Sequence, residues 1–203
     1  MVAIDVSRLD QGQSGDFQTS EPLSMERVVL LRDRVKPYEF PPGDGKIEAY
    51  LGIDIGSVST NLVVLDEAGE MVKEIYVKTD GRPVEVVNKG LADIWNEMGP
   101  RLEILGVATT GSGRELIGEL IGADTVNDEI TAHKTGATFI GRKLIDRVPD
   151  TIFEIGGQDS KFISLQDGVV VDFAMNEACA AGTGSFLEEQ AEKLGIKIIG
   201  EFA

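Results

Sequence analysis

The sequence predicts an α/β fold built around an internal β-β-β-α repeat. The apolar motif "IDIG" at residues 53–56 returns as "FEIG" at residues 153–156. Each copy is followed by a second strand, an acidic glycine turn ("DEAG" and "QDG"), a third strand and a helix. Four features in the same order favour a repeat over coincidence between two ordinary hairpins. We therefore expect two related halves in one fold.

The first block contains three expected strands and a helix. Short alternating apolar segments predict strands within residues 50–56, 59–69 and 70–79. Pro83 suits the first turn of the helix that follows. We place the single tryptophan, Trp95, in the core with the apolar stripe of this helix. That stripe repeats at helical spacing and predicts one buried face: Val84, Val87, Leu91, Ile94 and Met98.

A polar glycine loop and two further helices complete the first half. Residues 103–113 predict a strand that ends in the loop 109–113, a common place for a ligand contact in α/β folds. A simple turn is the alternative for this loop. Residues 114–121 and 127–147 predict helices, the second capped by Asn127. The second block then predicts three strands within 151–176 and a helix around 184–195.

The sequence divides into three predicted regions. Residues 1–48 are rich in Asp, Gln, Ser and Pro and predict a linker or tail. Residues 49–150 form the first half of the repeat, and residues 151–203 form the start of the second half, which is incomplete. This organisation suggests a fragment of a longer chain.

Composition excludes several classes of protein. Acidic residues outnumber basic ones 35 to 19, and the resulting net charge of −16 opposes binding to nucleic acid. No apolar run approaches the roughly 20 residues that cross a bilayer, and the N-terminus lacks the pattern of a signal peptide. The single cysteine precludes an intrachain disulfide and fits a reducing compartment. We expect a cytoplasmic protein without nucleic-acid or membrane partners.

The two glycine turns after "IDIG" and "FEIG" predict a phosphate site. Glycine allows the backbone to approach an anion closely, and a neighbouring carboxylate can hold Mg²⁺ that bridges phosphate oxygens. Two such turns across a cleft would hold a nucleotide, whereas two ordinary hairpins are the alternative. No P-loop motif is present. The candidates are Asp54, Gly56, Ser57, Val58 and Ser59 in the first turn, and Glu154, Gly156, Gly157, Gln158 and Asp159 in the second.

Four segments together resemble a known family. "YLGIDIGSVST", "TTGSGR", "EIGGQDSK" and "MNEACAAGTGSF" resemble the BadF/BadG/BcrA/BcrD-type ATPases, the activators of 2-hydroxyacyl-CoA dehydratases and the related benzoyl-CoA reductase subunits. The resemblance runs from about Tyr50 to Gly195. It implies an actin-like ATPase fold, in which two ribonuclease H-like halves close on Mg-ATP or ADP, with the second half truncated here. It also implies a homodimer with a [4Fe–4S] cluster at its interface.

The resemblance assigns roles to particular residues and shows three departures. Cys179 matches a cluster ligand, and the phosphate contacts map to the two glycine turns. The second cluster cysteine is replaced by Ala132, beside His133, so a dimer would supply two thiolates, whereas a cubane normally takes four. Glu154 stands where the family usually has Asp, and the closing elements of the second half are absent. A small buried cysteine is the alternative for Cys179.

The functional hypothesis is an ATPase domain. It would couple hydrolysis of Mg-ATP to low-potential electron transfer to a 2-hydroxyacyl-CoA dehydratase, with Glu154, Gln158 and Asp159 positioning the attacking water. The alternative is a non-catalytic, cluster-free module for nucleotide-dependent interaction or dimerisation. A small-molecule kinase on the same fold is a third option, although no acidic base for it can be identified. We expect Lys161, which follows the second turn, to be a surface residue, and contact with a phosphate is the alternative.

Overall fold

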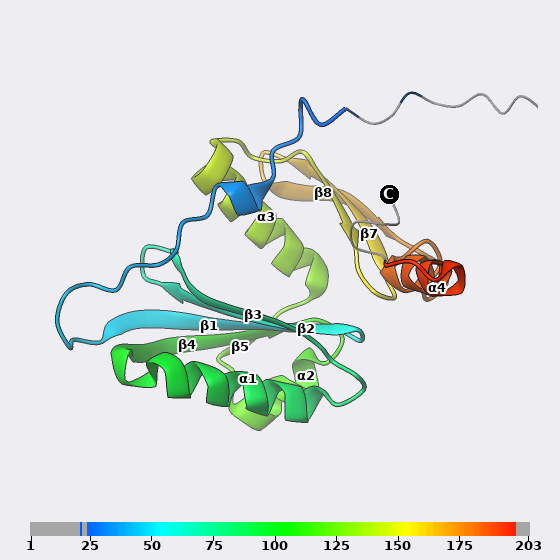
Figure 1. Ribbon diagram of the computed structural model, residues 1–203. Helices are drawn as coiled ribbons and strands as arrows, with labels where there is room; N and C mark the ends of the chain where they lie inside the picture. Colours follow the sequence, from blue (N-terminus) through cyan, green and yellow to red (C-terminus); the bar gives the residue numbers. More distant parts are fainter. Residues whose placement is uncertain (1–20, 22–23, 198–203) are drawn as a thin grey trace, which may run out of the picture. The chain divides into compact units, whose positions relative to one another are not determined.

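The computed structural model describes residues 21 and 24–197. A five-stranded sheet has the order β3-β2-β1-β4-β5 (Figure 1). The first three strands form antiparallel pairs, and β4 lies parallel to both β1 and β5. The strands are β1 (Ile47–Ile55), β2 (Ser59–Asp66), β3 (Met71–Lys78), β4 (Leu102–Thr110) and β5 (Thr125–Val126).

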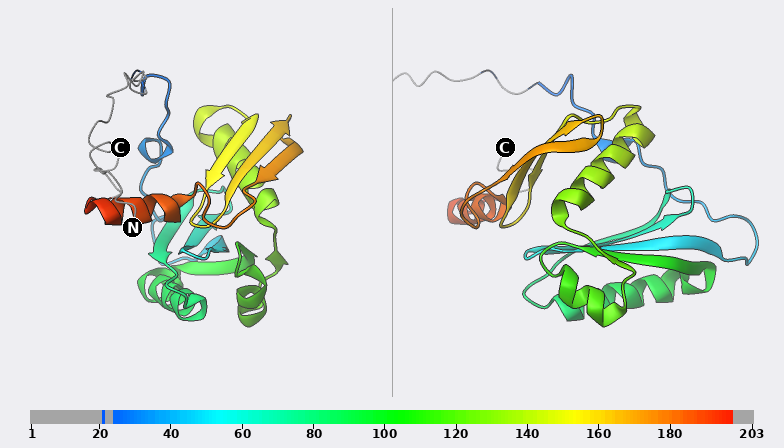
Figure 2. Two further views of the ribbon diagram at one scale, coloured as in Figure 1. Left: turned by 90° about the vertical axis from the view of Figure 1, so that its right-hand side faces the viewer. Right: turned by 180° about the vertical axis from the view of Figure 1, so that it is seen from behind.

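Two helices cover one face of this sheet. Helices α1 (Pro83–Met98) and α2 (Arg114–Ile121) lie on the same side of the sheet in every view (Figures 1 and 2). A short 3-10 helix, η3 (Gly99–Arg101), leads from α1 into β4. Side chains of β1, β2 and α1 form the core between the layers, including Ile53, Leu62, Val64, Val87 and Ile94.

The prediction that Trp95 belongs to the core is wrong. Trp95 is 67% exposed, whereas its neighbour Ile94 is 7% exposed. Successive helical residues point about 100° apart, so the stripe that buries Ile94 and Met98 leaves Trp95 outside it. The other predicted members of the stripe divide in the same way, because Val87 is buried and Val84 lies at the exposed margin.

Helix α3 (Glu129–Ile145) connects the first sheet to the second and packs against β6. Its N-cap is Asp128, whose side chain accepts a hydrogen bond of 2.9 Å from the Thr131 N–H. The predicted cap, Asn127, lies one residue too early and instead donates to Thr125 Oγ1. The lysine near the other end of the helix, Lys143, donates to the backbone of the β2–β3 turn.

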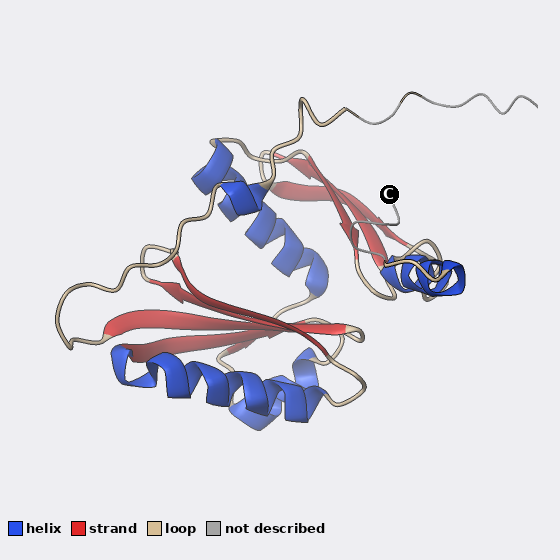
Figure 3. Cartoon of the chain, in the orientation of Figure 1, coloured by secondary structure: helices blue, strands red, loops and turns tan. Residues whose placement is uncertain are grey.

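The second sheet is antiparallel and has the order β6-β7-β8. The strands of both sheets are red in Figure 3. Its strands are β6 (Thr151–Ile155), β7 (Ser160–Gln166) and β8 (Val169–Met175), and α4 (Gly184–Leu194) follows. One face buries Ile163 and Leu165, whereas Phe153 and Ile155 on the other face are 74% and 63% exposed. The order β6-β7-β8-α4 repeats β1-β2-β3-α1, so the predicted α/β fold with its internal repeat is confirmed.

The chain divides into two units between Val35 and Lys36, and η2 (Leu31–Asp33) belongs to the first. In the second unit, the segment before β1 is held by hydrogen bonds to Asp66 of β2 and to Arg101 of η3. The Tyr38 hydroxyl donates to the Asp66 carboxylate, and the Arg101 guanidinium donates to two backbone carbonyls of residues 41–45. The domain boundaries near residues 48 and 150 stay predictions. Among the described residues, no helix is long and apolar enough to cross a membrane.

Candidate functional site

The first glycine turn joins β1 to β2 and is held by Thr79. The Gly56 N–H donates to the Ser59 carbonyl at 2.9 Å. A side chain at Gly56 would place Cβ 2.8 Å from that oxygen, so only glycine fits. The Thr79 hydroxyl donates to the Gly56 carbonyl, and the Thr79 N–H donates to the Val58 carbonyl, both at 2.8 Å. These contacts fix the turn next to the end of β3.

The second glycine turn joins β6 to β7 with the same geometry. The Gly156 N–H donates to the Asp159 carbonyl at 2.9 Å, as in the first turn. Here the clamp is the start of α4, where the Thr183 hydroxyl donates to the Gly157 carbonyl at 2.8 Å and the Ser185 N–H donates to it at 3.1 Å. The turn is therefore fixed against the N-terminus of α4.

The structure places the two turns against each other. A Cβ on Gly157 would collide with the Val58 side chain, so these residues of the two turns are in direct contact. An ion pair of 2.9 Å between Lys78 on β3 and Glu188 on α4 joins the same two regions. The two motifs that stand 100 residues apart in the sequence thus meet in space.

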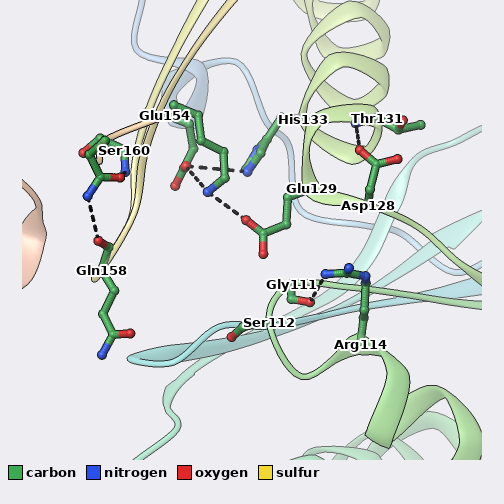
Figure 4. A network of polar contacts seen from close by, with 12 residues as sticks. Gly111, Ser112, Arg114, Asp128, Glu129, Thr131, His133, Glu154, Gln158 and Ser160 are labelled. Atoms are coloured by element: carbon green, nitrogen blue, oxygen red, sulfur yellow. Dashed lines mark hydrogen bonds and ion pairs between the residues drawn. The ribbon is translucent and has the colours of Figure 1, made fainter. Parts of the chain in front are cut away.

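The polar glycine loop lies at the end of β1 beside Asp54. The Gly113 N–H and the Ser112 hydroxyl both donate to the Ile55 carbonyl. Gly111 has a φ of +86° and leaves no room for a side chain next to the Asp54 carboxylate. The Arg114 guanidinium donates to the Gly111 carbonyl at 3.0 Å (Figure 4). The loop thus closes the site on the side of the first sheet.

A charged cluster lies between α3 and the second sheet. Lys161 Nζ is 2.8 Å from Glu129 Oε2 and 2.9 Å from Glu154 Oε2, and its side chain is 4% exposed. His133 Nε2 faces the same Glu154 oxygen at 3.8 Å (Figure 4). The expectation that Lys161 is a surface residue is therefore wrong. Its alternation with Ile163 along β7 is the sequence signal that places it on the buried face.

Burial and neighbouring charges shift two pKa values in this region. Burial raises the pKa of Asp54, the charges of Glu129 and Glu154 raise it further, and His133 and a hydrogen bond from Asn61 oppose the rise. Burial lowers the pKa of the cluster lysine, but its two glutamates more than offset this and raise it overall. The lysine therefore stays protonated and partly neutralises a region with excess negative charge.

Three further predicted residues lie around the second turn. Gln158 is exposed, and its carbonyl accepts hydrogen bonds from the Ala180 N–H and the Asn176 side chain. Asp159 is partly buried. Cys179 is exposed, so the alternative of a buried cysteine is wrong. The hydrogen bond from Ala180 holds the segment of Cys179 against the turn.

The residues present do not fit a [4Fe–4S] cluster. The chain has one cysteine, and a dimer would supply two of the four thiolates that a cubane normally takes. Ala132 has no ligating atom, and His133 faces Glu154. Within residue 21 and residues 24–197, no group of three or more His, Cys, Asp or Glu side chains is arranged to hold a metal ion.

The arrangement of the two glycine turns and the nearby carboxylates suits an anion that binds together with a cation. The two glycine turns lie in contact with each other, and the Asp54 carboxylate at the end of β1 feels the charge of Glu154 on β6. A phosphate chain alone would be repelled by these carboxylates. Mg²⁺ is usually bound by one or two carboxylates together with waters and substrate phosphates, so it needs no complete protein cage.

Comparison with known proteins identifies the family. Residues 51–199 match the model of the BadF/BadG/BcrA/BcrD ATPase family, and the chain belongs to this family. It is 32% identical over 149 residues to the (R)-2-hydroxyglutaryl-CoA dehydratase activating ATPase of Acidaminococcus fermentans, which covers 73% of this chain and 54% of that protein. An uncharacterized protein of Methanocaldococcus jannaschii is 34% identical over 157 residues, or 75% of this chain and 37% of that protein.

Solved structures agree with this assignment. The activator of the 2-hydroxyisocaproyl-CoA dehydratase from Clostridium difficile, with bound ADPNP, superimposes with a TM-score of 0.61 at 30% identity. The match covers 74% of this chain and 53% of that one. The predicted actin-like, ribonuclease H-like fold is thereby confirmed. The chain spans about half the length, or less, of the curated relatives named above.

Proposed function

We propose that this chain is the nucleotide-binding part of an ATPase, with Mg-ATP or Mg-ADP held between the turns 56–59 and 156–159. The observation that carries the proposal is the contact between Gly157 and Val58, which brings two glycine turns of the same geometry together. The family match and the ADPNP bound to a solved relative support it.

The residues take the following roles in this proposal. Asp54 and Glu154 hold the magnesium ion of the nucleotide through water, and the backbone of Gly56 and Gly157 approaches its phosphates. Glu154, Gln158 and Asp159 position the attacking water. Such chemistry depends on placement and electrostatics more than on a strong base, which fits the exposed Gln158 and partly buried Asp159 beside the turn.

The partner in this proposal is a dehydratase that acts on a 2-hydroxyacyl-CoA. The support is the activity for which the relatives are named, since they are activators of 2-hydroxyglutaryl-CoA and 2-hydroxyisocaproyl-CoA dehydratases. ATP hydrolysis would change the arrangement of the two sheets whose turns are in contact. We further propose that the protein works as a cytoplasmic homodimer.

Calorimetric titration with Mg-ADP tests nucleotide binding. We expect the unmodified chain to bind, and Asp54→Asn to weaken binding about tenfold or more, as loss of a charged hydrogen-bonded contact does. Asp93→Asn is the matched control, because Asp93 is a carboxylate on α1 that pairs with the exposed Lys89. Absence of binding by the unmodified chain, or equal affinity of the two variants, would contradict the proposal.

A second candidate function is a cluster-free module for nucleotide-dependent dimerisation. The single cysteine favours it. Iron content after anaerobic reconstitution, with Cys179→Ala as the control, separates the two candidates. About two iron atoms per chain that depend on Cys179 would mean one cubane per dimer and support the electron-transfer function. Iron that is absent, or that does not depend on Cys179, would favour the cluster-free module.

A further inference from the structure

We propose that Lys161 is a positioning residue that couples the second glycine turn to the first turn of α3. Nucleotide bound at the turn would thereby change the stability of the N-terminus of that helix. This inference rests on the proposed nucleotide binding and adds the element that responds to it.

Lys161 carries a buried charge. It is the one charged residue that is buried among residues 21 and 24–197; the other buried polar residues there are threonines. A buried charge is stable only when it is paired, and Lys161 meets this condition with two carboxylates, Glu129 and Glu154. The network is therefore sensitive to the loss of either partner, because removal of one partner leaves a buried charge uncompensated.

The two carboxylates come from different elements. Glu154 lies on β6 two residues before Gly156 and pairs in register with Lys161 on β7. Glu129 is the first residue of α3, directly after the cap residue Asp128. Lys161 thus joins the strand that leads into the second turn to the first turn of the helix.

The Glu154 carboxylate contacts Lys161 and also acts on Asp54. Its Oε2 lies 2.9 Å from Lys161 Nζ, and its charge, together with that of Glu129, raises the pKa of Asp54 at the end of β1. A magnesium ion near Asp54 would draw the Glu154 carboxylate toward it. The ion pair between Lys161 and Glu129 would then supply more of the charge compensation for the buried lysine. This change would affect the first turn of α3, where Glu129 lies. The shared carboxylate is the physical link between the two sites.

Hydrogen exchange at the start of α3 measures this coupling. The Thr131 and Ala132 amides donate to Asp128, so their exchange reports on the opening of the cap. We expect Mg-ADP to change their exchange in the unmodified chain about fivefold or more, the lower range of typical coupling. At saturating Mg-ADP, Glu129→Gln should lose this response, because Lys161 keeps its pair with Glu154 but no longer pairs with a charge on α3.

Glu85→Gln is the matched control. Glu85 is also a glutamate in the first turn of a helix, α1, but its partner is the exposed Arg82. It should keep the full response of α3 to Mg-ADP. Should Glu129→Gln fail to fold, Glu129→Asp replaces it, since the shorter side chain keeps the charge and withdraws from Lys161. We expect that variant to reduce the response as well.

The outcomes separate this inference from the proposed function. An unmodified chain that binds no Mg-ADP would overturn both. A chain that binds Mg-ADP but shows the same exchange in α3 with and without it would overturn the coupling alone. An unchanged response in Glu129→Gln, or in Glu129→Asp where that variant is needed, would also overturn the coupling alone.

Discussion

The contact between Gly157 and Val58 fixes how closely the two turns approach. Gly157→Ala would place Cβ against the Val58 side chain, and overpacking of this kind costs about 1–3 kcal/mol. We expect the variant to lower the free energy of unfolding by that amount in urea denaturation, and to weaken binding of Mg-ADP. Because the clash is with a single side chain, Val58→Ala should relieve it.

The double variant Val58→Ala with Gly157→Ala therefore tests the contact directly. We expect its free energy of unfolding to exceed the value that the two single changes predict when added, since neighbouring residues are not additive. Strict additivity would mean that the two turns do not touch in solution.

The cap residue Asp128 gives a pH-dependent prediction. Hydrogen bonds from Thr131 lower the pKa of Asp128 below its usual value of 3.8. Its stabilisation is therefore fully present above pH 3.8 and is lost as the pH falls through the lower native pKa. Asp128→Ala should cost about 1 kcal/mol near neutral pH, as for other N-caps. Denaturation at pH 7 and at pH 3 measures this, and an equal cost at both values would contradict it.

Residues with a local signal were predictable, and those that depend on tertiary neighbours were less so. The glycines and carboxylates of the two turns follow from the repeated motif. Lys161 was misjudged because a lysine is usually exposed, and only the partners brought by Glu129 and β6 make its burial stable. Cys179 gave no decisive signal in the sequence, since its exposure depends on the turn that carries it.

At the scale of elements, helix α1 places a core residue, Ile94, directly before a surface residue, Trp95. Ile94→Ala should cost about 2–4 kcal/mol, because it removes a buried side chain and leaves a cavity. Trp95→Ala should cost less than about 1 kcal/mol, since two thirds of this side chain is already exposed. Chemical denaturation of the two variants measures the difference. A larger cost for Trp95→Ala would show that this side chain is covered in solution.

Strands and helices are predictable where the apolar periodicity extends over enough residues to distinguish a strand from a helix. The three strands of each block and the helices α1 and α3 meet this condition. Strand β5 was missed, because two residues show no alternation and its pairing depends on β4. The strand order of the first sheet also cannot be predicted from local sequence patterns, because β4 pairs with β1 and not with β3, which precedes it in the chain.

At the scale of the whole molecule, the repeat leaves its two sheets differently covered. Ile53 lies beneath α1 in the core, whereas Phe153, its counterpart in the second block, is 74% exposed. Phe153 packs on Phe162 with ring centroids 5.2 Å apart, and Ile155 extends the same face. A contiguous exposed apolar patch on an edge strand favours association between molecules.

We therefore expect Phe153→Lys to lower the weight-average mass of the protein at high concentration in sedimentation velocity. The matched control is Tyr76→Lys. Tyr76 is a similarly exposed aromatic residue on β3, the edge strand of the first sheet. It pairs with Asn61 on β2, and the residues two positions away along β3 are the charged Glu74 and Lys78. It is not part of a contiguous patch, so its replacement should leave the mass unchanged. Equal effects of the two changes would assign the association to net charge rather than to the open face of the second sheet.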